Sequence, residues 1–373
     1  MGGLGKIMFG NTYQNKRVLV TGHTGFKGSW LTTWLLNLGA EVIGISKDIP
    51  TKPSMFEELG LEKRIQHHLI DIRNFDNLSQ IINQVKPDFV FHLAAQAIVS
   101  ISYNDPLETI SSNVIGTANV LEALRMSNNP CTAIIITSDK AYDNVEKICG
   151  YKENDRMGGK DIYSGSKGAA ELVIKSYYHS FFKLEKSNVC LAIARAGNVI
   201  GGGDWAKDRI VVDAMVAWHK GRKLEIRSPD ATRPWQHVLE PLSGYLNLGQ
   251  KLFCDKNFNG EYFNFGPRPE QNQTVKELLQ DLSEYWNLDK SKNAFTVIDK
   301  ITFHEAGLLK LNCEKALAKL KWKATLDYKE TIKYTSQWYY EFYKDDKNIL
   351  EQTVKQISDY EKIAKSQKLA WTE

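Results

Sequence analysis

A glycine-rich segment near the start of the chain constrains the fold more than any other feature. The segment 21–28, TGHTGFKG, follows an apolar run at 17–21 and precedes large apolar residues that recur at helical spacing over 26–38. The glycines therefore occupy a turn between a buried strand and a helix. There the backbone can approach a pyrophosphate, whose charge the helix N-terminus stabilises. We expect the dinucleotide to contact Gly22, Thr24, Gly25, Phe26 and Gly28.

The ends of three later strands complete the expected cofactor pocket. The strand at 41–46 ends at Ser46 and is followed by Lys47 and Asp48. An acid there favours the ribose of NAD, whereas Ser and Lys could accept the extra phosphate of NADP, so this strand end leaves both cofactors open. His92, at the end of the strand at 88–93, is predicted to be a core histidine rather than a catalyst. The pocket is predicted to include Asp71, Ile72, Leu93, Ala94 and Ala95.

Strands and helices alternate through the first half of the chain. Strands are predicted at 17–21, 41–46, 67–70, 88–93, 131–138 and 189–194, with helices at 26–38, 75–84, 107–127 and 163–183. This alternation predicts an α/β fold of the Rossmann type, a doubly wound parallel sheet covered by helices on both faces. We expect residues 1–198 and a returning segment at about 236–267 to form the cofactor domain. Segments 199–235 and 268–340 should form a smaller, discontinuous substrate domain, and 341–373 a solvated helical tail.

A Tyr and a Lys four residues apart, Tyr163 and Lys167, are predicted to lie on one face of a helix. A nearby ammonium favours the phenolate, so we expect Lys167 to lower the pKa of Tyr163 towards neutrality and allow it to act as a base on a substrate hydroxyl. Ser138 ends the fifth predicted strand, and the carboxyl ends of parallel strands meet at one crevice. Together with the glycine turn, Tyr163 and Lys167 predict nicotinamide redox chemistry.

Composition excludes several classes of protein. The 373 residues carry a net charge of only +4 and scattered Lys and Arg, so no nucleic-acid partner is expected. Five cysteines without CxxC spacing predict neither disulfides nor a metal site and favour a reducing cytoplasm. No apolar run is long enough for a bilayer, and the N-terminus lacks a secretory apolar segment. We expect a cytoplasmic protein with no membrane partner.

Four segments resemble the CDP-glucose 4,6-dehydratases, a family within the extended short-chain dehydrogenase/reductase superfamily. The GxxGxxG spacing of the glycine turn is the variant that this superfamily uses. The resemblance extends to about residue 340, and its segments are 21–30 (TGHTGFKGSW), 137–140 (TSDK), 195–205 (RAGNVIGGGDW) and 231–238 (ATRPWQHV).

The resemblance implies a closed redox cycle on a nucleotide sugar, with CDP-glucose as substrate and NAD as cofactor. Tyr163 would remove the 4-hydroxyl proton, Lys140 the C5 proton, and Asp139 would protonate the departing 6-hydroxyl. A lysine is a poor base at neutral pH unless its neutral form is favoured, so a charged Lys140 that stabilises an enolate stays an alternative. The resemblance also implies a homodimer through the helices at 107–127 and 163–183. The implied or chemically suited substrate contacts are Asn198, Arg209, Arg227, Arg233, His304 and Glu305.

Three other functions stay open at this stage. A nucleotide-sugar 4-epimerase would use Tyr163 and Lys167 but would have no task for Asp139 and Lys140. A reductase would release NADH. A cofactor-binding scaffold without activity could dispense with both Tyr163 and Lys167, which are present here.

Overall fold

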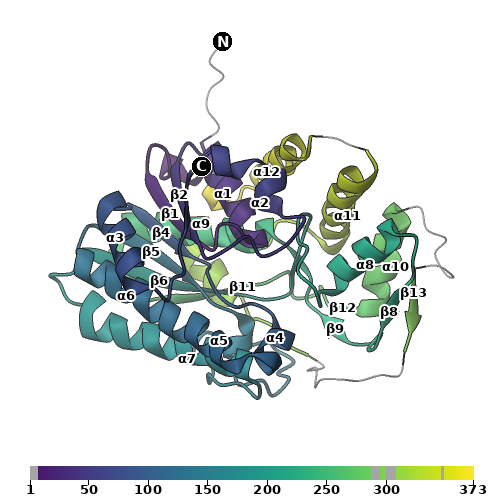
Figure 1. The fold of residues 1–373 in the computed structure, drawn as a ribbon, viewed down its shortest axis with the longest axis horizontal. Coiled ribbons are helices and arrows are strands. Elements are labelled where there is room, and N and C mark those ends of the chain that lie inside the picture. The colour runs from purple at the N-terminus through teal and green to yellow at the C-terminus, as the bar shows by residue number, and fades with distance from the viewer. Residues whose placement is uncertain (1–6, 287–293, 299–307, 346–347) are drawn as a thin grey trace, which may run out of the picture.

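The computed structural model describes residues 7–286, 294–298, 308–345 and 348–373. Its centre is a seven-stranded parallel sheet with the order β11-β6-β5-β4-β1-β2-β3 (Figure 1). The predicted α/β doubly wound fold is confirmed, and all six predicted strands form within two residues of their expected bounds. The strands are β1 Arg17–Thr21, β2 Glu41–Ser46, β3 Gln66–Leu69, β4 Phe89–His92, β5 Cys131–Ile136, β6 Val189–Ala196 and β11 Tyr262–Phe265.

Helices cover both faces of the sheet because successive strand residues point to opposite sides. On β1, Val18 and Val20 join one apolar core, whereas Leu19 joins the other. The first core packs α1 (Phe26–Asn37), α9 (Leu239–Cys254) and α12 (Ile349–Ser366) on the sheet. The second contains α3 (Phe75–Val85), α6 (Gly116–Ser127) and α7 (Ile162–Tyr177). Figure 1 shows the sheet edge-on between these two layers.

The two long helices predicted at 107–127 and 163–183 form, but each contains a π-helical turn. The first divides into α5 (Pro106–Ile110), the π turn η3 (Ser111–Ile115) and α6. The second is α7 followed by the π turn η5 (Tyr178–Phe182). The shorter helix α4 (Val99–Asn104) precedes α5, and α2 (Met55–Glu58) follows β2.

The two segments expected to bind substrate lie side by side. In the part of this region that the structure describes, β8 (Leu224–Ile226) pairs in parallel with β13 (Phe295–Val297), and β9 (Thr232–Arg233) pairs antiparallel with β12 (Gln273–Thr274). Three helices complete this region or join it to the sheet: α8 (Ile210–His219), α10 (Val275–Tyr285) and α11 (Tyr328–Lys344). Two short strands, β7 (Val199–Ile200) and β10 (Gln236–His237), pair beside them. The division into two domains stays a prediction.

The C-terminal helix differs from its expectation, because it is packed into the protein rather than solvated. Helix α12 lies against α1, and Tyr360 and Trp371 are fully buried. The Trp34 indole donates a hydrogen bond of 2.9 Å to Glu361, and the ring of Phe9 stacks on Trp371 with centroids 5.0 Å apart. A helix that is rich in Lys can pack against the protein through one apolar face while its Lys side chains stay in water.

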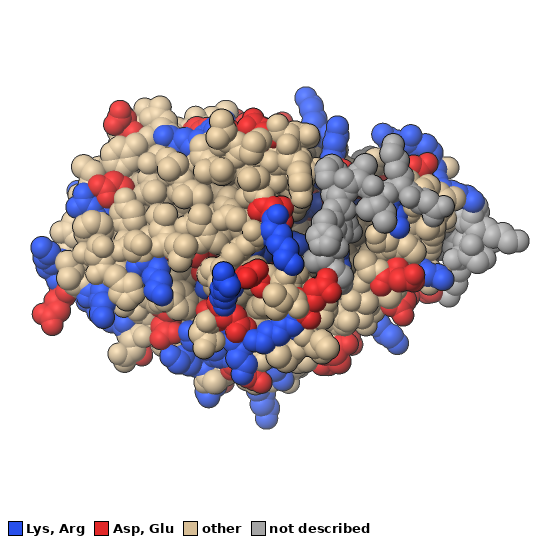
Figure 2. All heavy atoms as spheres, turned by 90° about the horizontal axis from the view of Figure 1, so that it is seen from below, with Lys and Arg blue, Asp and Glu red and all other residues tan. Residues whose placement is uncertain are grey.

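Charged residues of both signs are interspersed on the face shown in Figure 2, beside a broad area of uncharged residues. Among the helices that the structure describes, none has the length and apolar character needed to cross a bilayer.

Candidate active site

The glycine turn after β1 has the close approaches that its sequence predicted. Gly22 adopts φ +77°, a conformation that strains other residues, and a Cβ on Gly28 would lie 2.1 Å from the Gly22 carbonyl oxygen. Gly25 is the N-cap of α1 and provides no side chain to cap the helix. A glycine turn against an uncapped helix N-terminus suits a pyrophosphate, so the chain's own backbone fits a dinucleotide at this position.

Thr24 connects the glycine turn with the end of β2. Its hydroxyl donates to the Asp48 carbonyl at 2.7 Å, and its amide donates to the Ser46 hydroxyl at 3.3 Å. Ser46 is buried and also bonds His23 Nδ1 at 3.0 Å. Ser46 is therefore engaged inside the protein, and Lys47 becomes the first residue at this strand end whose side chain faces the surface.

The residues expected around the adenine and nicotinamide ends flank the same edge of the sheet. Asp71, after β3, forms an ion pair with Arg73, whereas Ile72 is buried against Gly116 of α6. Leu93, Ala94 and Ala95 follow β4, and a Cβ on Gly22 would lie 2.8 Å from the Ala94 amide nitrogen. The backbones of β1 and β4 thus converge on the turn.

His92 is a core residue, as predicted. Its Nδ1 lies 2.7 Å from the Thr21 hydroxyl and its Nε2 lies 3.1 Å from the Thr117 hydroxyl. Burial and the charge of Lys167 lower the pKa of His92 to about 3, which makes it a neutral structural group.

Ser138, Tyr163 and Lys167 are brought together and are all buried. The Ser138 hydroxyl is close enough to the Tyr163 phenol to lower its pKa, and Lys167 Nζ lies 5.8 Å from the centre of the Tyr163 ring. The start of α7 is fixed by Asp161, whose carboxylate accepts from the Ser164 amide at 2.9 Å. Farther along, Ser166 donates to the Tyr163 carbonyl at 2.7 Å and accepts from Asn113 at 2.9 Å.

The expectation that Lys167 alone brings the pKa of Tyr163 near neutrality is wrong. Burial and the neighbouring Asp139 carboxyl raise the pKa of the Tyr163 phenol to about 12, although the nearby Ser138 hydroxyl opposes this shift. Burial, followed by the charge of Lys27, also lowers the pKa of Lys167 to about 8. Desolvation penalises both charged forms, the phenolate of Tyr163 and the ammonium of Lys167.

Asp139 and Lys140 lie in the short 3₁₀ turn η4 (Asp139–Ala141), directly after Ser138. Asp139 is buried, and its Oδ1 accepts a hydrogen bond of 2.9 Å from Ser138. Burial raises the pKa of Asp139 against the opposing effects of Lys140, Ser138 and Lys27. Burial thus shifts this carboxyl towards its protonated form, in which it can serve as an acid.

Lys27 is the main residue that the sequence analysis missed. It lies in the first turn of α1, directly after the glycine turn, and its charge acts on Asp139, Lys167 and Arg209. Burial and the charge of Arg209 lower the pKa of Lys27 to about 8. A signal was available, because this long cation stands between Phe26 and Gly28 in the turn predicted to meet the cofactor.

A buried ion pair joins the elements that carry the reacting residues. Arg195 of β6 pairs with Glu171 of α7, both nearly inaccessible to solvent, and Thr137 donates to Glu171 at 2.6 Å. Arg195 also donates to the Tyr142 hydroxyl at 2.6 Å. These contacts join the end of β5 to β6 and α7, the elements that carry Ser138 and Tyr163.

The structure describes four of the six candidate substrate contacts. Arg209 precedes α8, pairs with buried Asp204 at 2.6 Å and acts electrostatically on Tyr163, which places it near the reacting residues. Asn198 has φ +48° and follows Gly197 beside Asp139. Arg227, after β8, acts electrostatically on Asp213 of α8, and Arg233 lies on β9 next to Pro234, which lines a small hollow with Asp139 and Gly197. His304 and Glu305 lie outside the described residues.

The parallel sheet and its glycine turn are those of the short-chain dehydrogenase/reductase fold. A family model described as GDP-mannose 4,6 dehydratase matches residues 19–335, and the chain belongs to this family. The chain is 45% identical to a CDP-glucose 4,6-dehydratase of Salmonella typhimurium, over 94% of this chain and 97% of that protein. It is 24% identical to a dTDP-glucose 4,6-dehydratase of Haemophilus influenzae, over 86% of this chain and 97% of that protein.

Solved structures share the fold at lower identity. A dTDP-glucose 4,6-dehydratase of Bacillus anthracis in complex with NAD has a TM-score of 0.72 and 20% identity, with 90% of this chain and 99% of that chain covered. A UDP-glucose 4-epimerase of Thermotoga maritima with UDP-glucose has a TM-score of 0.75 and 22% identity, with 87% and 99% covered. One fold thus serves both kinds of enzyme.

Proposed function

We propose that this protein is a CDP-glucose 4,6-dehydratase, a lyase that converts CDP-glucose to CDP-4-dehydro-6-deoxyglucose and water. The observation that carries the proposal is the position of Asp139 and Lys140, which directly follow Ser138 and lie near Tyr163. An acid and a second basic group beside a redox-type Tyr are what elimination of water requires. The 45% identity to the Salmonella enzyme over nearly the whole chain supports the substrate.

NAD is the proposed cofactor. The glycine turn and the start of α1 would hold its pyrophosphate, with Gly22, Thr24, Gly25, Phe26 and Gly28 in contact. Bound there, NAD would take a hydride from sugar C4 and give it back at C6. NAD in dehydratases and epimerases of the same fold supports this choice.

In the first step, Tyr163 would accept the proton of the 4-hydroxyl while Ser138 holds that hydroxyl. Because the phenol has a pKa of about 12 in the buried site, additional positive charge must support the phenolate. Lys167 lies near the ring, and the oxidised nicotinamide carries a positive charge of its own. Proton release from Tyr163 should therefore be linked to cofactor binding.

In the elimination step, the C4 ketone acidifies the C5 proton, which Lys140 would accept. Asp139, whose pKa burial raises, would give its proton to the 6-hydroxyl so that water leaves. Reduction at C6 and return of the proton from Lys140 to C5 give the product with no net redox change, and transfer of a proton from Tyr163 to Asp139 would restore both groups. Substrate phosphates would be bound by Arg233, whose planar guanidinium suits two oxygens. Weaker candidates for substrate contacts are Asn198, Arg209 and Arg227.

The decisive experiment incubates the full chain with catalytic NAD and CDP-, dTDP-, UDP- and GDP-sugars. A dehydratase produces a compound lighter by one water that absorbs in base as a 4-keto sugar, and CDP-glucose should give the highest rate. An epimerase would instead give a product of unchanged mass, and a reductase would accumulate NADH in proportion to product. Either result would contradict the proposal.

We also propose a homodimer in the cytoplasm. Helices α5 and α7 are in contact, and apolar side chains on their outer surfaces are exposed, with Leu107 75% and Leu172 57% accessible. Figure 2, seen from the side of these helices, has a broad uncharged area. Five free thiols support the compartment. In light scattering, Leu172→Glu should give monomers, whereas Leu317→Glu, at a site 52% exposed in another part of the chain, should not.

A further inference from the structure

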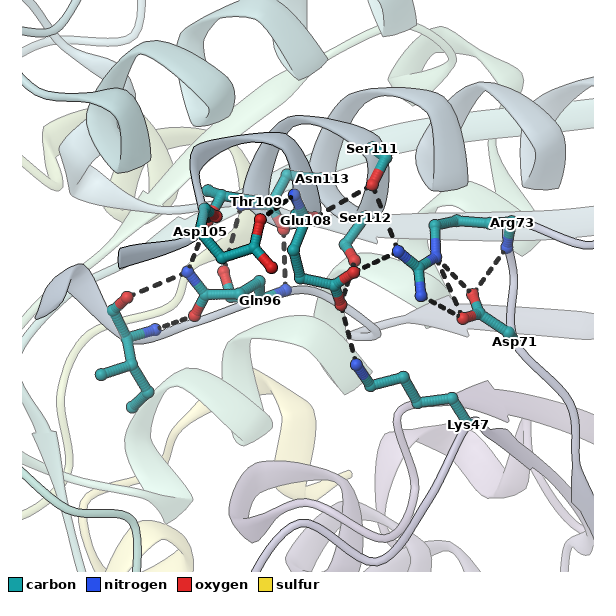
Figure 3. A network of polar contacts seen from close by, with 11 residues as sticks. Lys47, Asp71, Arg73, Gln96, Asp105, Glu108, Thr109, Ser111, Ser112 and Asn113 are labelled. Atoms are coloured by element: carbon teal, nitrogen blue, oxygen red, sulfur yellow. Dashed lines mark hydrogen bonds and ion pairs between the residues drawn. The ribbon is translucent and has the colours of Figure 1, made fainter. Parts of the chain in front are cut away.

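Two cations lie at the strand ends that border the glycine turn, and one carboxylate of α5 binds both. Lys47 follows β2, and its Nζ lies 2.8 Å from Glu108 Oε1. Arg73 lies two residues after Asp71 and donates to the other oxygen of Glu108 as well as to Asp71. Figure 3 shows the Glu108 side chain between Lys47 and Arg73. The proposed mechanism gives none of these three residues a role.

This cluster lies where a dinucleotide fold reads the adenosine ribose. The group near the end of the second strand either contacts the ribose 2′-hydroxyl of NAD or accommodates the 2′-phosphate of NADP. Thr24 of the glycine turn holds the Asp48 carbonyl at 2.7 Å, which keeps Lys47 at the rim of that turn. A ribose whose pyrophosphate is bound at α1 therefore has its 2′ position close to Lys47 and Arg73.

The charges of the cluster do not favour a phosphate. Lys47 and Arg73 would attract one, because a guanidinium and an ammonium are the usual partners of phosphate oxygens. Three carboxylates oppose them, namely Asp71, Glu108 and the neighbouring Asp48. The side chain of Glu108 is only 22% exposed, so water screens its charge less than it screens an open surface residue.

Glu108 is held in this position by its own helix. Asp105 caps α5 and accepts a hydrogen bond of 3.0 Å from the Glu108 amide. Ser112 donates to Glu108 Oε1 at 3.2 Å, and Ser111 accepts from Arg73 at 3.2 Å. The carboxylate is therefore fixed between the two cations rather than free to move away when a ligand arrives.

We infer that Glu108 is a specificity-determining residue, which neutralises Lys47 and Arg73 and so selects NAD over the 2′-phosphate of NADP. The inference rests on the proposed function in taking a dinucleotide as cofactor. It assigns the choice of cofactor to α5 rather than to the residue that ends β2, since Ser46 is buried and bonded to His23 and Thr24. Removal of the Glu108 charge should leave Lys47 and Arg73 available to a phosphate.

The test compares the binding of NAD and NADP to the full-length wild type and to Glu108→Gln by isothermal titration calorimetry. We expect the wild type to prefer NAD, and Glu108→Gln to bind NADP at least about tenfold more tightly while its affinity for NAD changes less than about threefold. The gain should shrink at high salt. Lys47→Ala in the Glu108→Gln background should remove most of it, and Glu108→Asp, which keeps the charge, should retain the preference for NAD.

The matched control is Glu122→Gln, since Glu122 pairs with Arg125 on α6 and the substitution removes one carboxylate in the same way. An unchanged affinity for NADP in Glu108→Gln overturns the inference. So does an equal gain for NAD, or the same gain in Glu122→Gln, because either would be a general effect of net charge. Failure of the proposed function would look different: the wild type would bind neither cofactor, or would bind NAD and form no 4-keto product.

Discussion

The carboxyl of Asp139 lies directly against Gly197, with no room for a side chain between them. A Cβ built on Gly197 would lie 1.9 Å from Asp139 Oδ2 and 2.1 Å from its Cγ. Gly197 follows the last residue of β6, so the backbone leaving the sheet forms one wall around the carboxyl. The absence of a side chain at 197 thus sets where the proposed acid stands.

Gly197→Ala should displace that acid. Because a misplacement of about 1 Å can lower a catalytic rate by about a hundredfold, we expect turnover to fall by one to two orders of magnitude, with NAD binding retained. Gly266→Ala is the control, since its nearest neighbour, Cys313 Sγ, would lie at an ordinary 3.4 Å. Product formation, NAD titration and thermal unfolding measure these effects. Normal turnover in Gly197→Ala would show that the position of Asp139 does not limit the reaction.

Tyr163→Phe keeps the buried ring and removes the hydroxyl. Loss of the base should lower turnover by about 10²- to 10⁴-fold, since this is the usual contribution of a positioned proton acceptor. Folding should persist, as judged by circular dichroism, because the buried ring is kept. Tyr285→Phe, on a residue 42% exposed in α10, should have wild-type activity. An active Tyr163→Phe variant would exclude the phenol as the base.

Lys140→Ala separates the oxidation from the elimination. If Lys140 accepts the C5 proton, the variant should still reduce bound NAD in a single turnover, but exchange of the C5 hydrogen with solvent deuterium should nearly stop. A small added amine should restore part of that exchange. Unchanged exchange would contradict the assignment, and loss of the first NAD reduction would assign Lys140 to binding.

Stability should depend on pH through Lys167. Burial lowers its pKa to about 8, whereas in the unfolded chain the ordinary value is near 10.5. Between these values the unfolded chain binds more protons, so the free energy of unfolding rises as pH increases from about 8 towards 10.5. Relative to Lys167→Met, the wild type should gain roughly 2 kcal/mol between pH 7.5 and 9.5, measured by urea unfolding. The exposed Lys175→Met should follow the wild type at both pH values. Parallel pH profiles for wild type and Lys167→Met would refute this shift.

Six of the seven strands of the central sheet could be predicted from sequence, because most of them, such as β1 and β5, are buried on both faces and are therefore continuous apolar runs. The exception among the seven was β11. Spacing was also enough to bring Tyr163 and Lys167 together, and the position of Ser138 after β5 predicted its place beside them. These features depend on local periodicity and on the rule that parallel strand ends meet at one edge.

Other features depend on contacts between distant segments, which a single sequence does not display. The high pKa of Tyr163 follows from how completely the surrounding elements exclude water, and the contact of Asp139 with Gly197 follows from the exit path of β6. The burial of α12 was within reach, because Thr353, Ile357, Tyr360 and Ala364 recur at helical spacing on its inner face. Its many lysines concealed that pattern.

The seventh strand has a consequence for how the protein is made. Residues 262–265 of β11 complete the sheet beside β6, and α9 packs on β5 and β6, yet both elements follow the long segment that contains α8 and β8–β10. About 265 residues must therefore leave the ribosome before β11 pairs with β6, by which point α9 is also available to pack on β5 and β6. Until then the apolar surface of β5 and β6 is exposed to other nascent chains. A protein fragment that ends at residue 198 should consequently aggregate or require a chaperone. A fragment that extends through β11 can form the complete seven-stranded sheet.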